Sequence, residues 1–310
     1  HTDYLEGHID PLANDVRLAK AFLGGVGAYG SDLRTKGFSG FLTELLVLEY
    51  GGFRPLLDAA ADWNPPIRLD PESHGQATFD DPLVVVDPTD PERNVAAVCS
   101  ARNVGRLIHY AREMLKNPRT EAFDDDDPDP LSAEAVRRYV TDRGTTPVAV
   151  RFTAPDIVED QLYPQLEKSG AGIEGALRRA GFDPLRTARF ADETAVLFIE
   201  CAVAELPAVI RHDGPPVGVR SHAEGFYEVY ANDESAAGPF IDDEGRYVVE
   251  RPRDARTPAE LVEAELFEVS LGPHIESALK DGYDLLVGEE VATLAEEFGV
   301  ELASYFDPQP

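Results

Sequence analysis

The sequence predicts an α+β protein in which a mainly helical region precedes a small mixed α/β region with an inserted subregion. Residues 14–116 carry apolar side chains mostly at helical spacing, and further along the chain strands alternate with helices. Between the two regions, "FDDDDPDPLS" at 123–132 is acidic and interrupted by prolines, which is typical of a solvated linker. We therefore expect a helical domain over 16–118, an acidic linker over 119–135 and an α+β domain over 136–310.

The helical region contains start and stop signals for three helices. We expect the first to begin at Asn14 or Asp15, either of which can cap it, and to run through "VRLAKAFL" to a pair of glycines. "SGFLTELLVLEYG" is a nearly continuous apolar helix that Gly51 can end, and "DPLVVVDP" predicts a short buried strand. Ser100 can cap the third helix, "ARNVGRLIHYAREML". Its apolar stripe consists of Val104, Leu107, Ile108, Ala111 and Leu115.

The second region predicts a small α+β sandwich. Strand "PVAVRFTAP" is followed by helix "DQLYPQLEKSGAGIEGALRRAG" and by strands "LRTARFA" and "TAVLFIECAVAEL". Residues 213–250 form the inserted subregion, with aromatic residues in "EGFYEVY" and a hairpin in "FIDDEGRYVV". We expect "TPAELVEAELFEV" and "EEVATLAEEFG" to be helices near the end of the sequence.

The charge of the chain is strongly negative. Its 310 residues include 58 acidic and 28 basic residues, of which only five are lysine, and the net charge is −30. This composition is typical of a protein from a salt-saturated cytoplasm, where self-repulsion is screened within about 3 Å at 1 M salt. Such a charge does not exclude a nucleic-acid partner, because local basic patches decide phosphate contacts. No apolar run is long enough to cross a membrane, and Cys99 and Cys201 predict buried thiols, so we expect a cytoplasmic protein.

One locally basic segment stands out, "GVGAYGSDLRTKGFSGF" with the helix before it. Over 16–41 the basic residues are Arg17, Lys20, Arg34 and Lys36, against Asp32 as the one acid. The glycines allow backbone to approach a ligand closely, and Tyr29 adds a hydroxyl. A lysine, a hydroxyl and open backbone N–H groups suit a polyphosphate. From the pattern alone, a solvated basic face beside a turn explains the segment better than a phosphate site does.

Other motifs in the sequence give weaker evidence for a functional site. "GAGIEG" at 170–175 matches a dinucleotide-binding pattern, but a predicted helix precedes it where that motif needs a strand. "DDDDPD" lies in the predicted linker, whereas a two-metal site needs carboxylates on rigid elements. The sequence contains neither GxSxG nor HxxxH. We therefore assign no catalytic and no metal-binding residues.

Three long segments resemble archaeal-type (class I) CCA-adding enzymes, which are tRNA nucleotidyltransferases. They are "NDVRLAKAFLGGVGAYGSDLRTKGFSGFLTELLVLEYGGF", "DPLVVVDPTDPERNVAAVCS" and "PDIVEDQLYPQLEKS". The resemblance implies a neck domain over 16–118 and a body with an inserted tail over 136–310. Residues 1–15 then correspond to the end of a catalytic head, whose Gly-Ser turn and Mg²⁺-binding carboxylates are absent here. We expect a fragment, or a protein whose head is a separate chain, that is inactive alone.

The resemblance also implies which residues contact CTP or ATP. His1 corresponds to the histidine at the head–neck junction, Lys20 to the lysine that ends "NDVRLAK" and Tyr29 to the tyrosine of "GAYG". Arg93 is similar to the family arginine that faces the nucleobase. In the implied reaction the tRNA 3′-hydroxyl attacks the α-phosphate and pyrophosphate leaves, with two metal ions bound by the head.

The resemblance implies that the body and tail hold the tRNA acceptor stem and its 3′ end by shape. The candidate contacts are Arg137, Arg138, Arg143, Arg151, Arg178, Arg179, Arg186 and Arg189, and each is equally well explained by a salt bridge on an acidic surface. A homodimer is left open. The alternative to an enzyme part is a non-catalytic RNA-binding protein derived from this family, while an oligoadenylate-synthetase-like enzyme would lack "LYPQLEK".

Overall fold

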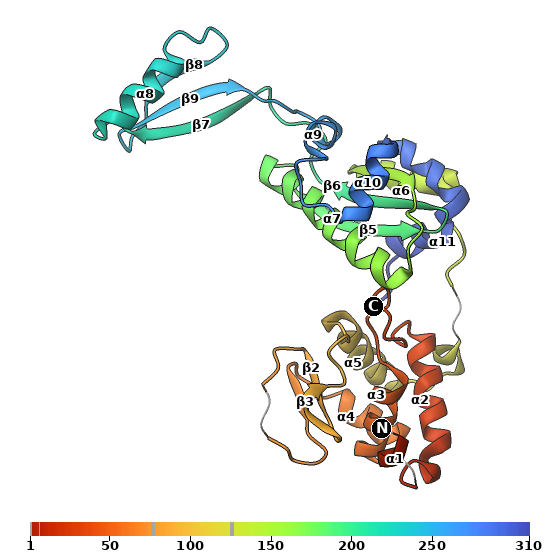
Figure 1. The fold of residues 1–310 in the computed structure, drawn as a ribbon. Helices are drawn as coiled ribbons and strands as arrows, with labels where there is room; N and C mark the ends of the chain where they lie inside the picture. The colour runs from red at the N-terminus through yellow and green to blue at the C-terminus, as the bar shows by residue number, and fades with distance from the viewer. Residues whose placement is uncertain (1, 6, 76–77, 125–126) are drawn as a thin grey trace. The chain divides into compact units, whose positions relative to one another are not determined.

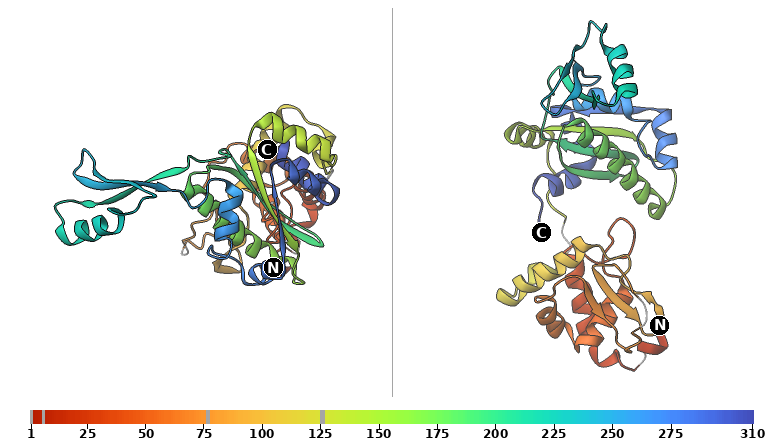
Figure 2. Two further views of the ribbon diagram at one scale, coloured as in Figure 1. Left: turned by 90° about the horizontal axis from the view of Figure 1, so that it is seen from above. Right: turned by 90° about the vertical axis from the view of Figure 1, so that its left-hand side faces the viewer.

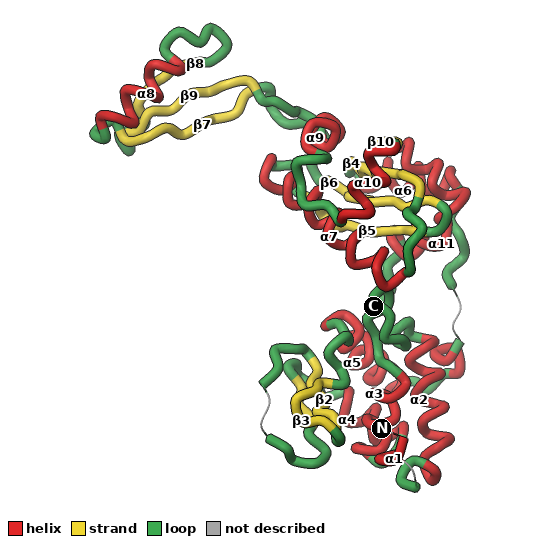
Figure 3. Tube along the Cα trace, in the orientation of Figure 1, coloured by secondary structure: helices red, strands yellow, loops and turns green. Residues whose placement is uncertain are grey.

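The computed structural model of the chain describes all residues except 1, 6, 76–77 and 125–126 (Figure 1). It confirms the α+β class, with both helices and small sheets (Figure 3). Contacts divide the chain into two compact units. Unit 1 comprises residues 1–129, 157–164 and 307–310, and unit 2 comprises 130–156 and 165–306.

Unit 1 combines helices with a three-stranded sheet of order β1-β2-β3, in which β1 and β2 are parallel and β2 and β3 antiparallel. Its helices are α1 (Thr2–Leu5), η1 (Asp10–Leu12), α2 (Ala13–Gly25), α3 (Gly40–Tyr50), α4 (Phe53–Ala60), α5 (Ala101–Lys116) and η2 (Thr120–Phe123). Its strands are β1 (Ile67–Leu69), β2 (Leu83–Asp87) and β3 (Asp90–Asn94).

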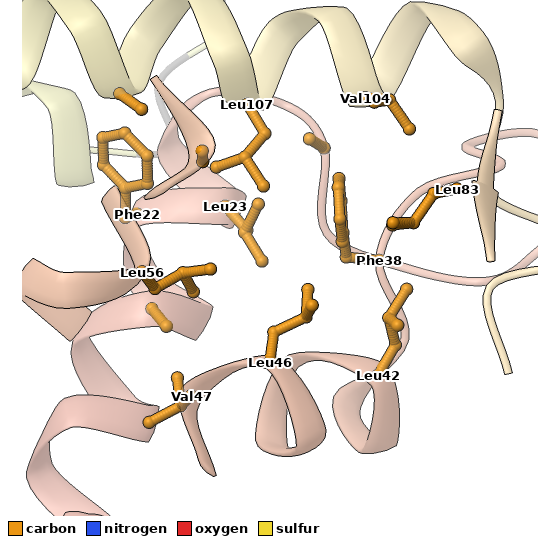
Figure 4. Close-up of a cluster of buried hydrophobic side chains, with 14 of the residues drawn as sticks. Phe22, Leu23, Phe38, Leu42, Leu46, Val47, Leu56, Leu83, Val104 and Leu107 are labelled. Carbon is orange, nitrogen blue, oxygen red and sulfur yellow. The ribbon is translucent and has the colours of Figure 1, made fainter. Parts of the chain in front are cut away.

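The core of unit 1 lies where α2, α3, α4, α5 and β2 meet (Figure 4). Figure 4 shows side chains from each of these elements converging, and Phe38, from the loop before α3, stands among them. Phe38 and every residue of β2 are buried. Because α3 sits in this core, its long apolar run is accounted for by packing rather than by a membrane, and no helix in the described part of the chain is long and apolar enough to cross one.

Two of the predicted helix boundaries in unit 1 are confirmed and one is wrong. Gly51 ends α3 with φ +78°, and the Ser100 hydroxyl accepts a hydrogen bond from the Asn103 N–H at the start of α5. The predicted cap of α2 is wrong, because α2 continues directly from η1 and begins at Ala13. Asn14 instead accepts a hydrogen bond from Arg17, and Asp15 accepts one from the Phe53 N–H at the start of α4.

Other features of unit 1 differ from the expectation in detail. The short strands β1 and β3 were not foreseen, and in the α5 stripe Met114 is buried where Leu115 is only partly so. The region expected as linker contains η2, and Phe123 packs against Phe22 with ring centroids 5.8 Å apart. The first residues of that region therefore belong to the core of unit 1, while part of its acidic run lies outside the described residues.

Unit 2 is built on a four-stranded antiparallel sheet of order β10-β4-β6-β5. Its strands are β4 (Thr146–Thr153), β5 (Pro184–Ala191), β6 (Thr194–Cys201) and β10 (Tyr283–Val287). Its helices are α6 (Ala133–Arg143), α7 (Glu159–Ala180, which starts in unit 1), α9 (Pro258–Glu265), α10 (Pro273–Asp281), η3 (Gly288–Leu294) and α11 (Ala295–Phe306). Buried residues of α6, η3 and α11 pack on the sheet face that carries Val196 and Phe198. α7 lies on the opposite face, where its Gly170 approaches Leu197.

The inserted subregion forms a sheet of its own, of order β7-β9-β8, with one helix on it (Figure 2). Its elements are β7 (Val209–Pro216), α8 (Arg220–Tyr230), β8 (Ala237–Ile241) and β9 (Arg246–Pro252). Phe226 of α8 stacks on Tyr247 of β9 with centroids 6.0 Å apart, so aromatic contacts bind the helix to the sheet.

The predicted strands and the long helix of unit 2 are confirmed, as is the hairpin, in which Ile241 pairs with Tyr247. "GAGIEG" lies inside α7, so it does not follow a strand as a dinucleotide site requires. "EEVATLAEEFG" is not one helix: the 3₁₀ helix η3 precedes α11, and Phe298 has non-helical torsions. β7, β10 and α10 were not predicted.

Candidate nucleotide-binding site

Tyr29 lies on a loop that leaves α2 and returns to α3. The Gly30 N–H donates to the Phe38 carbonyl, and the Phe38 N–H donates to the Ala28 carbonyl, so the two arms of the loop run side by side. A Cβ placed on Gly37 would lie 2.1 Å from the Ala28 carbonyl oxygen. Glycine at 37 therefore permits the close approach that closes the loop.

Helix α5 holds both arms of this loop. Asn103 donates from Nδ2 to the carbonyls of Thr35 (2.7 Å) and Lys36 (2.9 Å), and the Ser100 N–H also donates to Lys36. On the other arm, Arg106 donates from Nη1 to the Gly27 carbonyl at 2.9 Å. These contacts fix the loop, and with it Tyr29, to the rigid helix.

Lys20 and Tyr29 converge on the first residue of α3. A Cβ built on Gly40 would lie 3.3 Å from Tyr29 Oη and 3.6 Å from Lys20 Nζ. Tyr29 as a residue is 39% exposed. The structure thus brings two of the residues predicted to contact a nucleotide to one place, from α2 and from the glycine-rich loop.

Glu44 completes this group and was not foreseen. Lys20 Nζ donates to Glu44 Oε1 at 2.6 Å, and both side chains are about one-third to one-quarter exposed, at 31% and 26%. Glu44 follows Gly40 by one helical turn, which places it on the face of α3 that Lys20 reaches. The sequence shows Glu44 and Glu49 as two acids in a mostly apolar run, but it does not show which of them meets Lys20.

Arg17 and Arg34 of the segment make contacts away from Lys20. Arg17 is exposed and bonded to Asn14, and Arg34 lies 5.3 Å from the centre of the Tyr163 ring and 3.9 Å from Glu159. The charges of Arg17, Lys20 and Arg34 therefore meet separate partners, and that of Lys20 is balanced by a carboxylate.

Arg93 lies on β3 and pairs with a buried carboxylate. Its Nη1 is 3.1 Å from Asp87 Oδ2, while Asp87 Oδ1 accepts from the N–H and the hydroxyl of Thr89. Asp87 is fully buried, whereas the Arg93 side chain is half exposed. Asp87 thus orients an accessible guanidinium at the edge of the small sheet.

Two further expectations from the sequence concern His1 and a metal ion. His1 lies outside the described residues. Within the described ranges, no group of three or more His, Cys, Asp or Glu side chains is arranged to hold a metal ion. The residues described here do not form a Mg²⁺ site.

Comparison with known proteins gives matches along most of the chain. Residues 14–124 match the family described as tRNA nucleotidyltransferase, second domain, and residues 143–288 match CCA-adding enzyme, C-terminal domain. The CCA-adding enzyme of Haloarcula marismortui is 57% identical over an alignment that spans all of this chain and 70% of that protein. This chain belongs to the CCA-adding enzyme family.

Other CCA-adding enzymes show the same partial coverage. That of Halobacterium salinarum is 58% identical over all of this chain and 69% of its own length. That of Methanoregula boonei is 40% identical over 99% of this chain and 66% of its own length. Haloarcula marismortui and Halobacterium salinarum are halophiles, which fits the acidic, lysine-poor composition of the chain.

The arginines predicted to contact tRNA in this CCA-adding enzyme chain differ in their surroundings. Arg143, Arg151 and Arg178 form ion pairs with Glu200, Asp284 and Glu174. These three ion pairs agree with the salt-bridge alternative for Arg143, Arg151 and Arg178. Arg137, Arg138 and Arg179 are exposed, and Arg186 stacks 4.3 Å from the centre of the Tyr305 ring. Arg189 is partly buried on β5.

Proposed function

We propose that this chain provides the nucleotide contacts and the tRNA-docking surface of an enzyme that adds the 3′-terminal CCA of tRNA from CTP and ATP. The observation that carries the proposal is the convergence of Lys20 Nζ and Tyr29 Oη on Gly40. An ammonium group and a phenolic hydroxyl at one glycine can both donate to phosphate oxygens, and the glycine leaves room for them. In this proposal His1 is a third phosphate contact.

The proposed reaction is nucleotidyl transfer. The 3′-hydroxyl oxygen of tRNA forms a bond to the α-phosphorus of CTP or ATP, the bond to the β-phosphate breaks, and pyrophosphate leaves. Within this chain, Lys20 and Tyr29 hold the triphosphate and Arg93, oriented by Asp87, faces the base. Mg²⁺ would be held by carboxylates of a catalytic head, since the described residues contain no group of three or more His, Cys, Asp or Glu side chains that could hold it.

Glu44 gives this site a second property. Before a nucleotide binds, the carboxylate of Glu44 balances the charge of Lys20 at 2.6 Å. A triphosphate carries more negative charge than one carboxylate and competes for the same ammonium group. Lys20 would therefore exchange one anionic partner for another. Until the nucleotide binds, Glu44 holds the ammonium group of Lys20 near Tyr29.

We assign tRNA docking to residues 136–310, with the exposed arginines Arg137, Arg138 and Arg179 as contacts. The alternative function, that of a non-catalytic RNA-binding protein derived from the family, would use the same docking surface. The two differ in whether nucleotide is ever transferred when the chain is completed by a catalytic domain.

The test uses the chain with tRNA that lacks its CCA end, labelled CTP and ATP, and Mg²⁺ at high KCl. We expect the chain alone to bind the tRNA and to incorporate no label, because it contains no carboxylate cluster for the metal among its described residues. Labelled tRNA from the chain alone would refute the assignment of the metal ligands. The same assay with the chain joined to the catalytic domain of a relative should restore incorporation, and failure there would favour the non-catalytic protein.

A further inference from the structure

Helix α5 presents a row of basic side chains on its solvent side. Positions 102, 105, 109, 112 and 116 follow one another at three or four residues and share one helical face. Four of them are exposed and polar or basic, namely Arg102, His109, Arg112 and Lys116, and partly buried Arg106 flanks the row. We call these five side chains the α5 ridge.

The charge of the ridge is opposite to that of the protein. The sixteen residues of α5 carry four basic side chains and one acid, a net charge of +3, in a chain of net charge −30. In the part of the chain that the structure describes, the recorded ion pairs neutralise only Lys116, through Glu113 at 3.3 Å. Arg112 donates to the Ala61 carbonyl at 2.6 Å, a neutral acceptor that does not balance its charge.

Like charges are placed close together on this helix. Arg106 donates to the Gly27 carbonyl and to the backbone oxygen of Pro310, the last of the 310 residues, and burial, together with the nearby charge of Arg102, lowers the pKa of its guanidinium. A protein with 58 acidic residues could supply carboxylates to balance these groups, as it does for Arg54 on α4. Arg102 and Arg112, which no ion pair recorded among the described residues neutralises, leave positive charge on this helix where a polyanion can bind.

The shape of the ridge suits a chain of phosphates rather than a single anion. A helix rises 1.5 Å per residue, so Arg102 and Lys116 are separated by about 21 Å along the axis. Between them, Gly105 has no side chain, and no atom lies within 4 Å of the position its Cβ would take. A strand could approach the helix there, with guanidinium groups on either side to meet its phosphates.

We propose that the α5 ridge binds the sugar–phosphate backbone of the tRNA during CCA addition. This inference rests on the function proposed above and extends it, because that function assigns RNA docking to residues 136–310. Since α5 also holds the loop of Tyr29 through Asn103 and Arg106, RNA on the ridge would contact the same helix that fixes the nucleotide site. The other polyanion of suitable charge is a second copy of this acidic chain.

The test is binding of fluorescently labelled tRNA lacking CCA to the chain over a range of KCl at which circular dichroism shows it folded. In the variant Arg102→Gln/Arg112→Gln, which removes two guanidinium groups that no recorded ion pair of the described residues neutralises, we expect weaker binding and a smaller dependence of log K on log [KCl], by roughly 0.7–0.9 for each phosphate that the variant no longer neutralises. The matched control is Arg54→Gln, which removes an exposed arginine of the same unit that is already paired with Asp58. It should leave the slope unchanged.

Each outcome decides between the assignments. If the unaltered chain binds tRNA and the double variant binds with the same slope, the ridge is not an RNA contact, while tRNA docking elsewhere stands. If the unaltered chain does not bind tRNA, both the ridge and the proposed docking function are wrong. If the double variant instead abolishes self-association in sedimentation equilibrium and leaves tRNA binding intact, the partner of the ridge is a second copy.

Discussion

Lys20 is the residue on which the nucleotide site depends, and its ion pair with Glu44 alters what its removal should do. The sequence and the family resemblance pointed to Lys20 and Tyr29, and the structure brings both to Gly40. Sequence reasoning could not find Glu44 as a partner, because the contact joins two helices 24 positions apart. Pairing across helices is set by tertiary packing, which no local spacing encodes.

Replacing Lys20 with Ala in an enzyme completed by a catalytic domain should weaken the use of both nucleotides alike. A hydrogen bond to a charged group contributes roughly 1.5–3 kcal/mol, so kcat/KM for CTP and for ATP should each fall about ten- to a hundredfold. The measurement is a pair of steady-state titrations at high KCl. Arg93→Ala is the matched comparison and should change the ratio of CTP to ATP use. Unaltered kinetics in Lys20→Ala would mean that the basic turn is only a solvated face.

Replacing Glu44 with Gln should have the opposite effect on binding. Glutamine keeps a hydrogen-bond acceptor for Lys20 but removes the competing charge, and a partly exposed ion pair contributes about 0.2–1 kcal/mol. The KM for both nucleotides should therefore fall, by up to about fivefold, with kcat little changed. Isothermal titration with CTP provides an independent check. A raised KM would show that the carboxylate itself helps to bind nucleotide, through a water or a metal.

At the scale of elements, long segments with strong periodicity were predictable and short edge strands were not. α5 has a clear cap and an apolar stripe, and the long run of α7 has helical spacing. The central strands β4 and β6 are nearly all buried, so their apolar sequences predict them. β1 has only three residues, and β10 is an edge strand whose residues are at most partly buried. Such strands form because a neighbour offers hydrogen bonds, and their own sequences carry little signal.

The loop that carries Tyr29 shows the same limit and yields a prediction. Its glycines were visible in the sequence, but its attachment to α5 through Asn103 was not. Asn103 is almost fully buried and donates to two loop carbonyls. Asn103→Ala should cost about 1–3 kcal/mol of stability and loosen the loop, because these carbonyls lose their donor. Hydrogen exchange at the amides of Gly30 and Phe38 should become faster.

Asn14→Ala is a suitable control for that variant, since Asn14 is exposed and its recorded contact is with Arg17 on the same helix. Its effect on exchange in the loop should be negligible. If exchange at Gly30 and Phe38 were unchanged in Asn103→Ala, then the pairing of the two loop arms with each other would be sufficient to hold Tyr29.

At the scale of the whole molecule, the chain consists of two units with separate cores, and this makes local effects separable. The single tryptophan, Trp63, lies in unit 1, where it donates to the Tyr50 hydroxyl at 3.2 Å. Tryptophan fluorescence therefore reports on unit 1, whereas far-ultraviolet circular dichroism reports on both units.

Unit 2 contains a buried carboxylate that ties its stability to pH. Glu200 on β6 accepts hydrogen bonds from Arg143 at 2.6 and 2.9 Å, from Thr145 at 2.6 Å and from the Tyr305 hydroxyl at 2.8 Å. Burial by itself would raise the pKa of Glu200, but these hydrogen bonds outweigh it and hold the pKa below its usual value. The ionised form is thus favoured in the folded state.

The lowered pKa of Glu200 fixes the direction of the pH effect. Because the folded-state pKa lies below the unfolded one, the carboxylate contributes its full stability above the unfolded value of about 4.3. That contribution is lost as the pH falls through the folded-state pKa. Glu200→Gln cannot ionise, so it should lower the free energy of unfolding at neutral pH by about 1–3 kcal/mol and flatten its decline in acid.

The two optical probes make the Glu200 prediction specific. In Glu200→Gln, the circular dichroism transition assigned to unit 2 should move to lower denaturant concentration, while the Trp63 fluorescence transition should stay in place, because Glu200 belongs to the other unit. High KCl is needed in both experiments to screen the net charge of −30. A fluorescence transition that moves together with the circular dichroism would show that the two units unfold as one cooperative body, despite their separate cores.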